Sequence, residues 1–384
     1  MDGDRPPGAP KVSREGPSRR SLVLRTVGGT TVSLVALWLV FRSVDVAAAL
    51  SILSAASPVW IAVMAVAIAA DITVRTVRWR VLLAPVADVR LLRTFQYLTT
   101  GYAANNVLPA RLGELVRAHY IGDREGVSRS TALGTIVVER VLDFTALVAI
   151  AAAALVILGV RGEIGSAVAV GVAVSAVLVG GLAVALVGHR LPGAGRVAAA
   201  AERYPRIRDL VATFRAGIAV AGRARTLMPA VALTALAWTC TTVTFAAGAQ
   251  AVGIELTWSQ ALLLAAGVNL VTAIPAGPGF VGTWELAAVR ILATFGVAGD
   301  TAFAFALLVH VSTLGATTVC GAISYLRIGW LPTAPGAVMA PSAAREDAAV
   351  TGRADEAPVT GRADGAPVTG RPDEAEGGAT TGRP

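Results

Sequence analysis

Uncharged segments long enough to cross a membrane alternate along most of the chain with shorter segments that contain the arginines. A helix needs about 20 mainly apolar residues to cross the hydrocarbon core of a bilayer, because it rises about 1.5 Å per residue. The uncharged windows that approach or exceed this length are residues 26–41, 46–70, 144–160, 164–188, 226–254, 256–284 and 301–326. They are too many and too long for the buried helices of one soluble core. The pattern therefore predicts an all-α fold, a polytopic integral membrane helical bundle.

Two uncharged segments contain residues that interrupt a helix. Asparagine, proline and glycine recur within residues 94–110 and in the middle of residues 256–284. Either both segments are re-entrant hairpins, or each pairs with its following helix to make two crossings. Simple spans are expected near 26–42, 56–77, 132–160, 164–188, 227–250 and 301–326. The prediction is six spans plus two re-entrant or broken helix segments, about eight transmembrane segments in all.

The distribution of Lys and Arg predicts the orientation, because basic residues concentrate in the cytoplasmic loops of membrane proteins. Six basic residues precede the first span, nine lie in 75–129 and eight in 189–225, whereas the connectors near Arg42, Arg161 and Arg290 hold one each. Placing the three basic regions inside gives a multi-pass protein of the cell (plasma) membrane with cytoplasmic N- and C-termini.

Composition separates the ends of the chain from its middle. The chain of 384 residues is 55% hydrophobic and 15% charged, against roughly 45–50% and about 25% in soluble domains. A nine-residue motif, VTGRADEAP, recurs with small changes through residues 350–376, and sequence this rich in Gly, Pro and charge cannot bury a core. We expect a disordered cytoplasmic N-terminus at 1–20, a transmembrane domain at 21–330 and a disordered cytoplasmic tail at 331–384.

The two interrupted segments share the pattern PAxxG, at residues 109–113 and 275–279. Each follows asparagine and precedes glutamate, an order that favours two repeated halves; a chance match in a chain with 40 Gly and 19 Pro is the alternative. Non-helical backbone within a bilayer must face protein or a water-filled cavity. A helix that starts after Pro109 would suit a lipid phosphate, with Arg111 and Arg117 as further donors, although both arginines also fit as interfacial anchors.

Glu139, Arg140 and Asp143 open the predicted third simple span. Positions 139 and 143 share a helix face, and ionisable groups within a span usually face a bundle interior or an aqueous pathway. A structural ion pair near the membrane surface is the alternative. Asp71 and Arg75 have the same spacing and are expected to pair at the end of the second span.

The other polar residues of the spans are interpreted as structural. Arg78, Trp79 and Arg80 fit the usual interfacial pattern, and His310 fits a hydrogen-bonded packing residue better than a proton relay. The two cysteines lie in apolar stretches without metal-ligand spacing, and the sequence contains no HExxH, nucleophile elbow or P-loop. We therefore expect no catalytic residue, no metal, no cofactor and no enzymatic activity.

Four short motifs follow one another within residues 20–330. They are Arg75-Thr-Val-Arg78-Trp79, Asn106-Val-Leu-Pro109-Ala110-Arg111-Leu112-Gly113-Glu114, Glu139-Arg140-Val-Leu-Asp143, and Pro275-Ala276-Gly277-Pro278-Gly279 before Trp284-Glu285. In this order they resemble the lysylphosphatidylglycerol synthase transmembrane, or flippase-like, domain family. The resemblance implies a bacterial-type integral membrane protein of about eight transmembrane segments that moves or handles lipids. In the multiple peptide resistance factor such a domain translocates aminoacylated phosphatidylglycerol, which a separate soluble domain makes. We expect no such soluble domain after residue 330 and therefore no synthase activity.

Three functions remain open. A flippase-like protein that translocates or handles phospholipids between leaflets is favoured; the alternatives are a membrane-embedded accessory or enzyme acting on lipid-linked glycans, and a structural subunit of a cell-envelope complex. The expected partners are membrane lipids with an anionic or aminoacylated phospholipid head group or another lipid-linked head group, not nucleic acid, and a homo-oligomer stays open. The residues expected to bind the lipid are Asn105, Asn106, Arg111, Glu114, Arg117, Glu139, Arg140, Asp143, Asn269, Pro275, Gly277, Gly279 and Glu285.

Overall fold

The computed structural model describes residues 31–42, 44–108, 112–159, 163–187, 212, 215–219, 223–272 and 277–329. All of them belong to one of the two units into which the chain divides, Met1–Ala337. The other unit, Val338–Pro384, and the predicted disordered termini at 1–20 and 331–384 lie outside the described residues.

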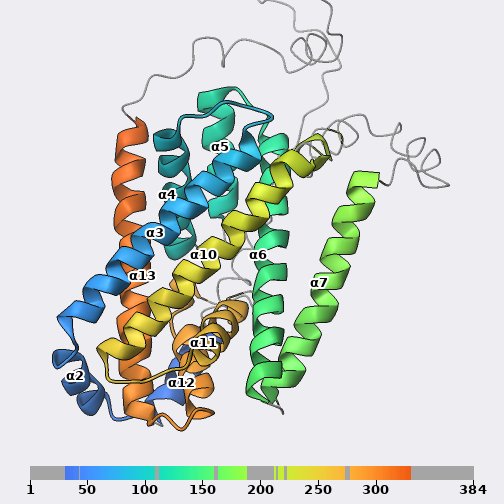
Figure 1. Ribbon diagram of the computed structural model, residues 1–384. Helices are drawn as coiled ribbons and strands as arrows, with labels where there is room; N and C mark the ends of the chain where they lie inside the picture. Colours follow the sequence, from blue (N-terminus) through green and yellow to red (C-terminus); the bar gives the residue numbers. More distant parts are fainter. Residues whose placement is uncertain are drawn as a thin grey trace, which may run out of the picture. The chain divides into compact units, whose positions relative to one another are not determined.

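Every described element of secondary structure is a helix (Figure 1). The elements are the helix Thr31–Phe41, α2 (Val46–Ser54), α3 (Pro58–Leu83), α4 (Leu91–Val107), α5 (Gly113–Glu125), α6 (Arg129–Leu158), α7 (Glu163–Val187), α10 (Ala224–Ala251), α11 (Trp258–Val271), the short 3-10 helix η3 (Pro278–Phe280), α12 (Thr283–Ala293) and α13 (Gly299–Gly329).

Among the described residues, four helices are long and apolar enough to cross a membrane by themselves, namely α3, α6, α10 and α13. The helix Thr31–Phe41 and α2 meet at an angle of 83° and would make a fifth span if the bent pair crosses as one. α7 is helical over 164–187 of the segment expected at 164–188. The prediction of an all-helical membrane bundle is confirmed, whereas the count of about eight segments and the internal repeat stay predictions.

Local sequence explains where several helices begin and end. Pro58 occupies the first turn of α3, where its missing N–H costs nothing. Ser128 caps α6 by accepting a hydrogen bond from the Thr131 N–H at 3.1 Å, and Gly159 ends the same helix with a φ of 64°. Thr257 opens α11 with a capping box. These caps fix the helix ends before any tertiary contact is considered.

Both interrupted segments are broken in the structure. Residues 108–112 separate α4 from α5, and residues 272–282, which include η3, separate α11 from α12. The residues at the centres of the breaks, 109–111 and 273–276, lie outside the described residues. Because α4 packs against η3, the two breaks meet within the bundle although they are far apart in the sequence.

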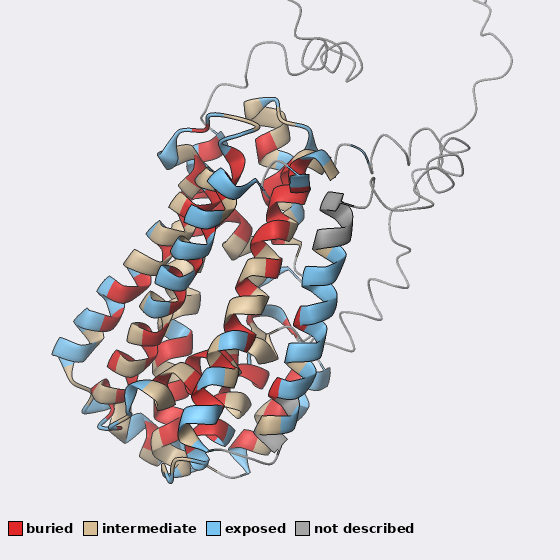
Figure 2. Cartoon of the chain, turned by 45° about the vertical axis from the view of Figure 1, so that its right-hand side comes forward, coloured by how far each residue is buried: buried red, intermediate tan, exposed pale blue. Residues whose placement is uncertain are grey.

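The outer faces of the long helices are apolar. α3 packs along α10 and α4 along α13, while α6 contacts both α7 and α11. Buried residues line the inside of this bundle and exposed residues its outside (Figure 2). The exposed side chains include Val66 on α3, Val156 on α6 and Val177 on α7, all at least 70% exposed. Soluble proteins rarely expose so much contiguous apolar surface, so these faces fit contact with lipid acyl chains.

One end of the bundle is the more basic one. The C-terminal ends of α3 and α13 lie beside the N-terminal ends of α6 and α10 (Figure 1). Arg80, Arg129, Arg225 and Arg327 belong to these four helix ends. The arrangement matches the sequence argument that placed the basic loops on one side.

Candidate functional site

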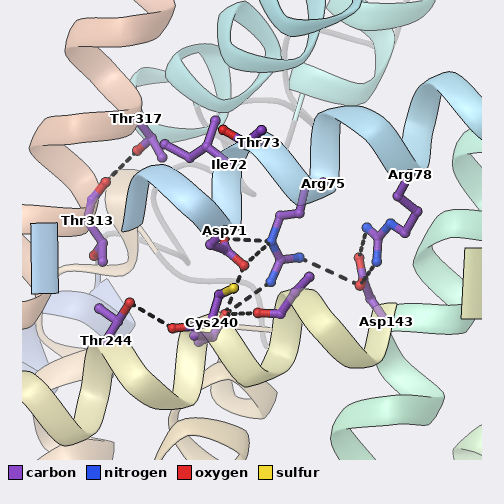
Figure 3. Close-up of polar contacts among 12 residues, drawn as sticks. Asp71, Ile72, Thr73, Arg75, Arg78, Asp143, Cys240, Thr244, Thr313 and Thr317 are labelled. Atoms are coloured by element: carbon purple, nitrogen blue, oxygen red, sulfur yellow. Dashed lines mark hydrogen bonds and ion pairs between the residues drawn. The ribbon is translucent and has the colours of Figure 1, made fainter. Parts of the chain in front are cut away.

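α3 presents a line of charged side chains to the interior of the bundle. Asp71, Arg75 and Arg78 follow one another at i, i+4 and i+7, a spacing that places residues along one side of a helix. Arg75 Nε donates to the two Asp71 oxygens at 2.9 and 2.8 Å, which confirms the expected ion pair (Figure 3). Arg75 also donates to Thr241 Oγ1 on α10 at 3.3 Å, and its guanidinium lies 4.8 Å from the centre of the Trp238 ring.

Arg78 joins α3 to α6. Its Nη1 and Nη2 donate to the two oxygens of Asp143 at 2.5 and 3.0 Å, and Nη2 also donates to Glu139 at 3.2 Å. Arg75 approaches the same Asp143 carboxylate at 3.6 Å, so two arginines of α3 converge on one acid of α6 (Figure 3). Glu139 and Asp143 face α3 together because they are four residues apart on α6.

Glu139 is fully buried and accepts hydrogen bonds from three arginines. Arg117 on α5 donates to its two oxygens at 3.3 and 2.7 Å, and Arg140 donates at 2.7 Å in addition to Arg78. The Arg117 guanidinium lies 3.9 Å over the Trp79 ring, a cation–π contact inside the bundle. A buried carboxylate is costly unless it is paired and hydrogen-bonded. The three arginines supply that pairing from three helices.

Two glycines let α5 bring Arg117 into the bundle. A methyl group on Gly101 of α4 would meet the Arg117 Cγ and Cδ atoms at 2.5 and 2.8 Å. Gly113, the first residue of α5, faces the Gly101 carbonyl and the Asn105 side chain in the same way. Asn105 Oδ1 accepts a hydrogen bond from the Gly113 N–H at 2.7 Å. Asn105 therefore positions the start of α5.

These ionic contacts form one connected cluster, which we call the arginine–carboxylate network. Its members are Asp71, Arg75, Arg78, Arg117, Glu139, Arg140 and Asp143. With four arginines and three acids, the network has a formal charge of +1. Glu114 on α5 adds a further negative charge that acts on Arg140 from outside the network.

A cavity of about 530 Å³ lies against the network, and its lining is part polar and part apolar. The polar lining includes Asp71, Arg75, Tyr102, Arg140, Asp143, Thr241, Thr244, Asn269, Thr313 and Thr317. The apolar lining includes Ile68, Ile72, Phe144, Leu147, Leu178, Trp238, Phe245 and Trp284. A molecule with a charged end and a hydrocarbon end matches this lining better than a wholly polar or wholly apolar one.

Two nitrogen donors of the cavity-lining residues lack a hydrogen-bond partner among the described residues. They are Arg140 Nε and Trp238 Nε1. The Arg140 side chain is 37% exposed, against 11% for Arg75 and 0% for Arg78. Neither buried donor atom is accessible from the cavity. The exposed part of Arg140 is therefore the part of the network most open to a molecule in the cavity.

Hydrogen bonds hold the second break in place. The Gly277 N–H donates to Ser33 Oγ of the helix Thr31–Phe41 at 3.0 Å. Glu285 Oε2 accepts from the Gly282 N–H at 2.6 Å, and its other oxygen lies 2.6 Å from His310 Nδ1 on α13. The expectation that His310 is a buried, hydrogen-bonded residue is confirmed.

The remaining predicted lipid-binding residues have separate surroundings. Asn106 Nδ2 donates to Thr317 and Thr318 on α13 at 3.0 and 2.9 Å. Asn269 lines the cavity and donates to the Ala265 carbonyl at 2.8 Å. Gly279 adopts a φ of 65°, and Glu114 lies half-buried in the first turn of α5.

The structure therefore divides the predicted lipid-binding residues into groups. Those in the network or on the cavity wall are Arg117, Glu139, Arg140, Asp143 and Asn269. Those whose contacts position the helix breaks are Asn105, Asn106, Gly277, Gly279 and Glu285. Glu114 belongs to neither group, and Arg111 and Pro275 lie outside the described residues.

Sequence reasoning missed three network residues of α3, namely Asp71, Arg75 and Arg78. The interfacial interpretation is wrong for Arg78, because this side chain is fully buried between two carboxylates. The available signal was the spacing of the three residues on one helix face. Among the described residues there is no group of three His, Cys, Asp or Glu side chains that could hold a metal ion.

Comparison with known proteins gives two matches. The family model described as "Lysylphosphatidylglycerol synthase TM region" matches residues 26–321. The glycosyltransferase AglD of Haloferax volcanii is 28% identical over 342 residues, a match that covers 79% of this chain and 54% of AglD. The chain thus spans about half the length of this curated relative.

Proposed function

The chain belongs to the lysylphosphatidylglycerol synthase transmembrane-region family, and from this membership and the cavity we propose that it moves lipids with anionic head groups between the leaflets of the cell membrane. The single observation that carries the proposal is the cavity, in which the arginine–carboxylate network and a set of large apolar side chains line the same space. A phospholipid has this division between a charged head and hydrocarbon chains.

The network supplies the contact for the head group. A lipid phosphate would accept hydrogen bonds from Arg140 and Arg75, the two arginines that line the cavity. Its negative charge would lie beside the arginines of the network, which lowers the cost of placing an anion in the bundle. Asp71 and Asp143, which also line the cavity, hold these arginines in position.

The hydroxyl and amide groups of the cavity suit a polar group beyond the phosphate. Thr241, Thr244, Thr313 and Asn269 lie on the cavity wall. Such groups would hydrogen-bond the hydroxyls or amines of a larger head group. This lining and the similarity to a protein named a glycosyltransferase favour a lipid-linked glycan as the second candidate substrate.

We also propose that both termini are cytoplasmic and that the chain acts by translocation, without a covalent reaction. The basic helix ends then face the anionic cytoplasmic leaflet. A structural role in a cell-envelope complex is the competing hypothesis, in which network substitutions change stability but no lipid moves.

Leaflet exchange in reconstituted vesicles tests the proposal. The full chain is placed in liposomes that contain a head-group-labelled phosphatidylglycerol, an aminoacylated phosphatidylglycerol or a polyprenyl-phosphate-linked sugar, and label in the inner leaflet is followed as it becomes accessible to a membrane-impermeant quencher. Native protein is expected to accelerate exchange of at least one lipid over empty vesicles. Equal rates with and without protein for all three lipids would overturn the proposal.

A matched pair of variants connects the rate to the cavity. Arg140→Gln removes a charge from the cavity wall, and loss of a hydrogen bond to a charged group, worth about 1.5–3 kcal/mol, predicts a fall in rate of about tenfold or more. Arg225→Gln removes an exposed charge from the first turn of α10 and should leave the rate unchanged. Equal effects of the two substitutions would contradict head-group binding at Arg140.

A further inference from the structure

A second buried ionic site lies next to the cavity, outside the arginine–carboxylate network. His310 on α13 and Glu285 on α12 face each other, with Nδ1 of the ring 2.6 Å from Oε1 of the carboxylate. Their side chains are 7% and 5% exposed. Ionisable groups are rare within membrane spans because their burial is costly, and chains of His and acidic residues there commonly carry protons.

The pair can hold a variable number of protons. With a neutral ring whose Nδ1–H donates to Oε1, the pair has a charge of −1; when Nε2 takes up a proton from water, the imidazolium and the carboxylate together have a charge of 0. The reaction forms one N–H bond, breaks one O–H bond of a hydronium ion and involves no oxidation.

The ring of His310 is separated from the cavity by one side chain. It stacks on the Trp284 ring, with centroids 4.7 Å apart and planes inclined by 13°. Trp284 lines the cavity, as does Thr313, one turn along α13 from the histidine. Phe245 of α10 is a second aromatic contact of Trp284, with ring centroids 5.6 Å apart. Trp284 therefore connects the pair to the cavity wall.

The same pair holds the second helix break. Glu285 Oε2 accepts the hydrogen bond of the Gly282 N–H at 2.6 Å, at the entry to α12. Gly282 has a φ of 92° and Phe280 a φ of 57°, and the left-handed region is costly for a residue that is not glycine. Glu285 thus contacts both the entry turn of α12 and the ring of His310.

Other charged groups lie on the helices packed against α13, but Glu285 is the one in contact with the ring among the described residues. Apart from Glu285, the charged residues of these helices are Arg290 on α12, Arg93 on α4, Arg225 on α10, and Asp71, Arg75, Arg78 and Arg80 on α3; the segment of α2 has none. Asp71, Arg75 and Tyr102 line the cavity together with Trp284, the ring that stacks on His310.

From these contacts we propose that His310 and Glu285 form a proton-binding site and that its occupancy drives the lipid through the cavity by way of Trp284 and the entry turn of α12. The coupling rests on the lipid movement proposed above, whereas proton binding by the pair does not.

Proton binding is measured without any transport. The chain has three histidines, so ¹⁵N-histidine-labelled full-length protein in detergent micelles gives a simple NMR spectrum, in which His310→Gln assigns the ring. The proposal requires the His310 ring nitrogens to change protonation within the pH range in which the protein stays folded. A ring that keeps one protonation state throughout this range overturns the proposal.

Coupling is measured in the vesicles with a pH difference across the membrane and with the membrane potential clamped by potassium and valinomycin. For one proton per lipid, a difference of one pH unit sustains a leaflet ratio of labelled lipid of about tenfold. His310→Gln and Glu285→Gln, which keep hydrogen-bonding groups but cannot exchange the proton, should reduce the ratio to one. His119→Gln, an exposed histidine of α5, should retain the native ratio.

The outcomes separate the two proposals. If the native protein moves no lipid but His310 titrates, the proposed transport function fails and the proton site stands. If the native protein moves lipid and its leaflet ratio stays at one under the pH difference, the coupling is overturned. A leaflet ratio that survives His310→Gln overturns it as well.

Discussion

The Arg78 guanidinium of α3 holds the Asp143 carboxylate of α6 through two parallel hydrogen bonds, Nη1 to Oδ1 at 2.5 Å and Nη2 to Oδ2 at 3.0 Å. This fork-to-fork geometry is one that lysine cannot reproduce, because its ammonium presents a single point of charge. The contact fixes the position of α3 against α6, and the arginines that face the cavity depend on it.

We expect Arg78→Gln to lower the free energy of unfolding by about 3–5 kcal/mol, because it leaves part of a buried carboxylate charge unpaired. The double variant Arg78→Gln/Asp143→Asn should lose less free energy of unfolding than the two single variants lose together. The difference, the coupling energy, is expected to be about 1–3 kcal/mol. Reversible unfolding in mixed detergent micelles measures both quantities. Additive effects would show that the two groups do not act as a pair.

Glu139→Gln is expected to destabilise the protein by a similar amount, about 3–5 kcal/mol, since three arginines lose their shared negative partner. Glu255→Gln makes the same chemical change in the exposed connection between α10 and α11 and should alter stability by no more than about 0.5 kcal/mol. Thermal unfolding of the purified variants in detergent compares them. Equal melting temperatures would contradict a structural role for the buried Glu139.

Two glycines of α13 should respond to alanine in opposite directions. A methyl group at Gly321 would collide with the Thr99 carbonyl of α4, so we expect a loss of about 1–3 kcal/mol. Gly315 has open space around the same position, and alanine there should stabilise the helix by about 0.5–1 kcal/mol. The free energies of unfolding of the two variants test this prediction. Stabilisation by both substitutions would mean that α4 and α13 lie further apart than described.

Single cysteines test the proposed orientation in a background with Cys240 and Cys320 replaced by alanine. Asp88→Cys lies in the connection between α3 and α4 at the basic end, and Glu255→Cys lies beyond the opposite end of α10. In intact cells, a membrane-impermeant maleimide should label position 255 and not position 88. Permeabilised cells, in which both should react, provide the control, and the reverse labelling pattern would invert the orientation.

The spans were predictable from the sequence because each depends on local properties. Charge-free length identified α3, α6, α10 and α13, and caps such as Ser128 and Gly159 mark the ends of α6. The helix breaks were also predictable, since proline and glycine interrupt helices regardless of their neighbours. The number of crossings was less accessible, because helices such as α2 and α11 are too short to decide by composition.

The network was only partly predictable, because membership depends on which helices meet. Glu139 and Asp143 stood out as acids within an apolar span. Arg78 has the sequence surroundings of an interfacial arginine, and only the approach of α6 shows that it is buried. Glu285 contacts His310, which is 25 residues away on another helix, so no local sequence pattern predicts this contact.

The network also has a consequence for how the protein is made. α3 leaves the ribosome before the acids of α6 that Arg75 and Arg78 contact, because Asp143 follows Arg78 by 65 residues. A charged residue at the centre of a span costs roughly 2.5–3.5 kcal/mol during insertion. The second half of α3 therefore gains its full stability in the bilayer only after α6 has been synthesised and has delivered its carboxylates. An early helix of this bundle thus depends on a later one for its stability. A nascent chain that ends between α3 and α6 contains α3 without the carboxylates that pair with its arginines.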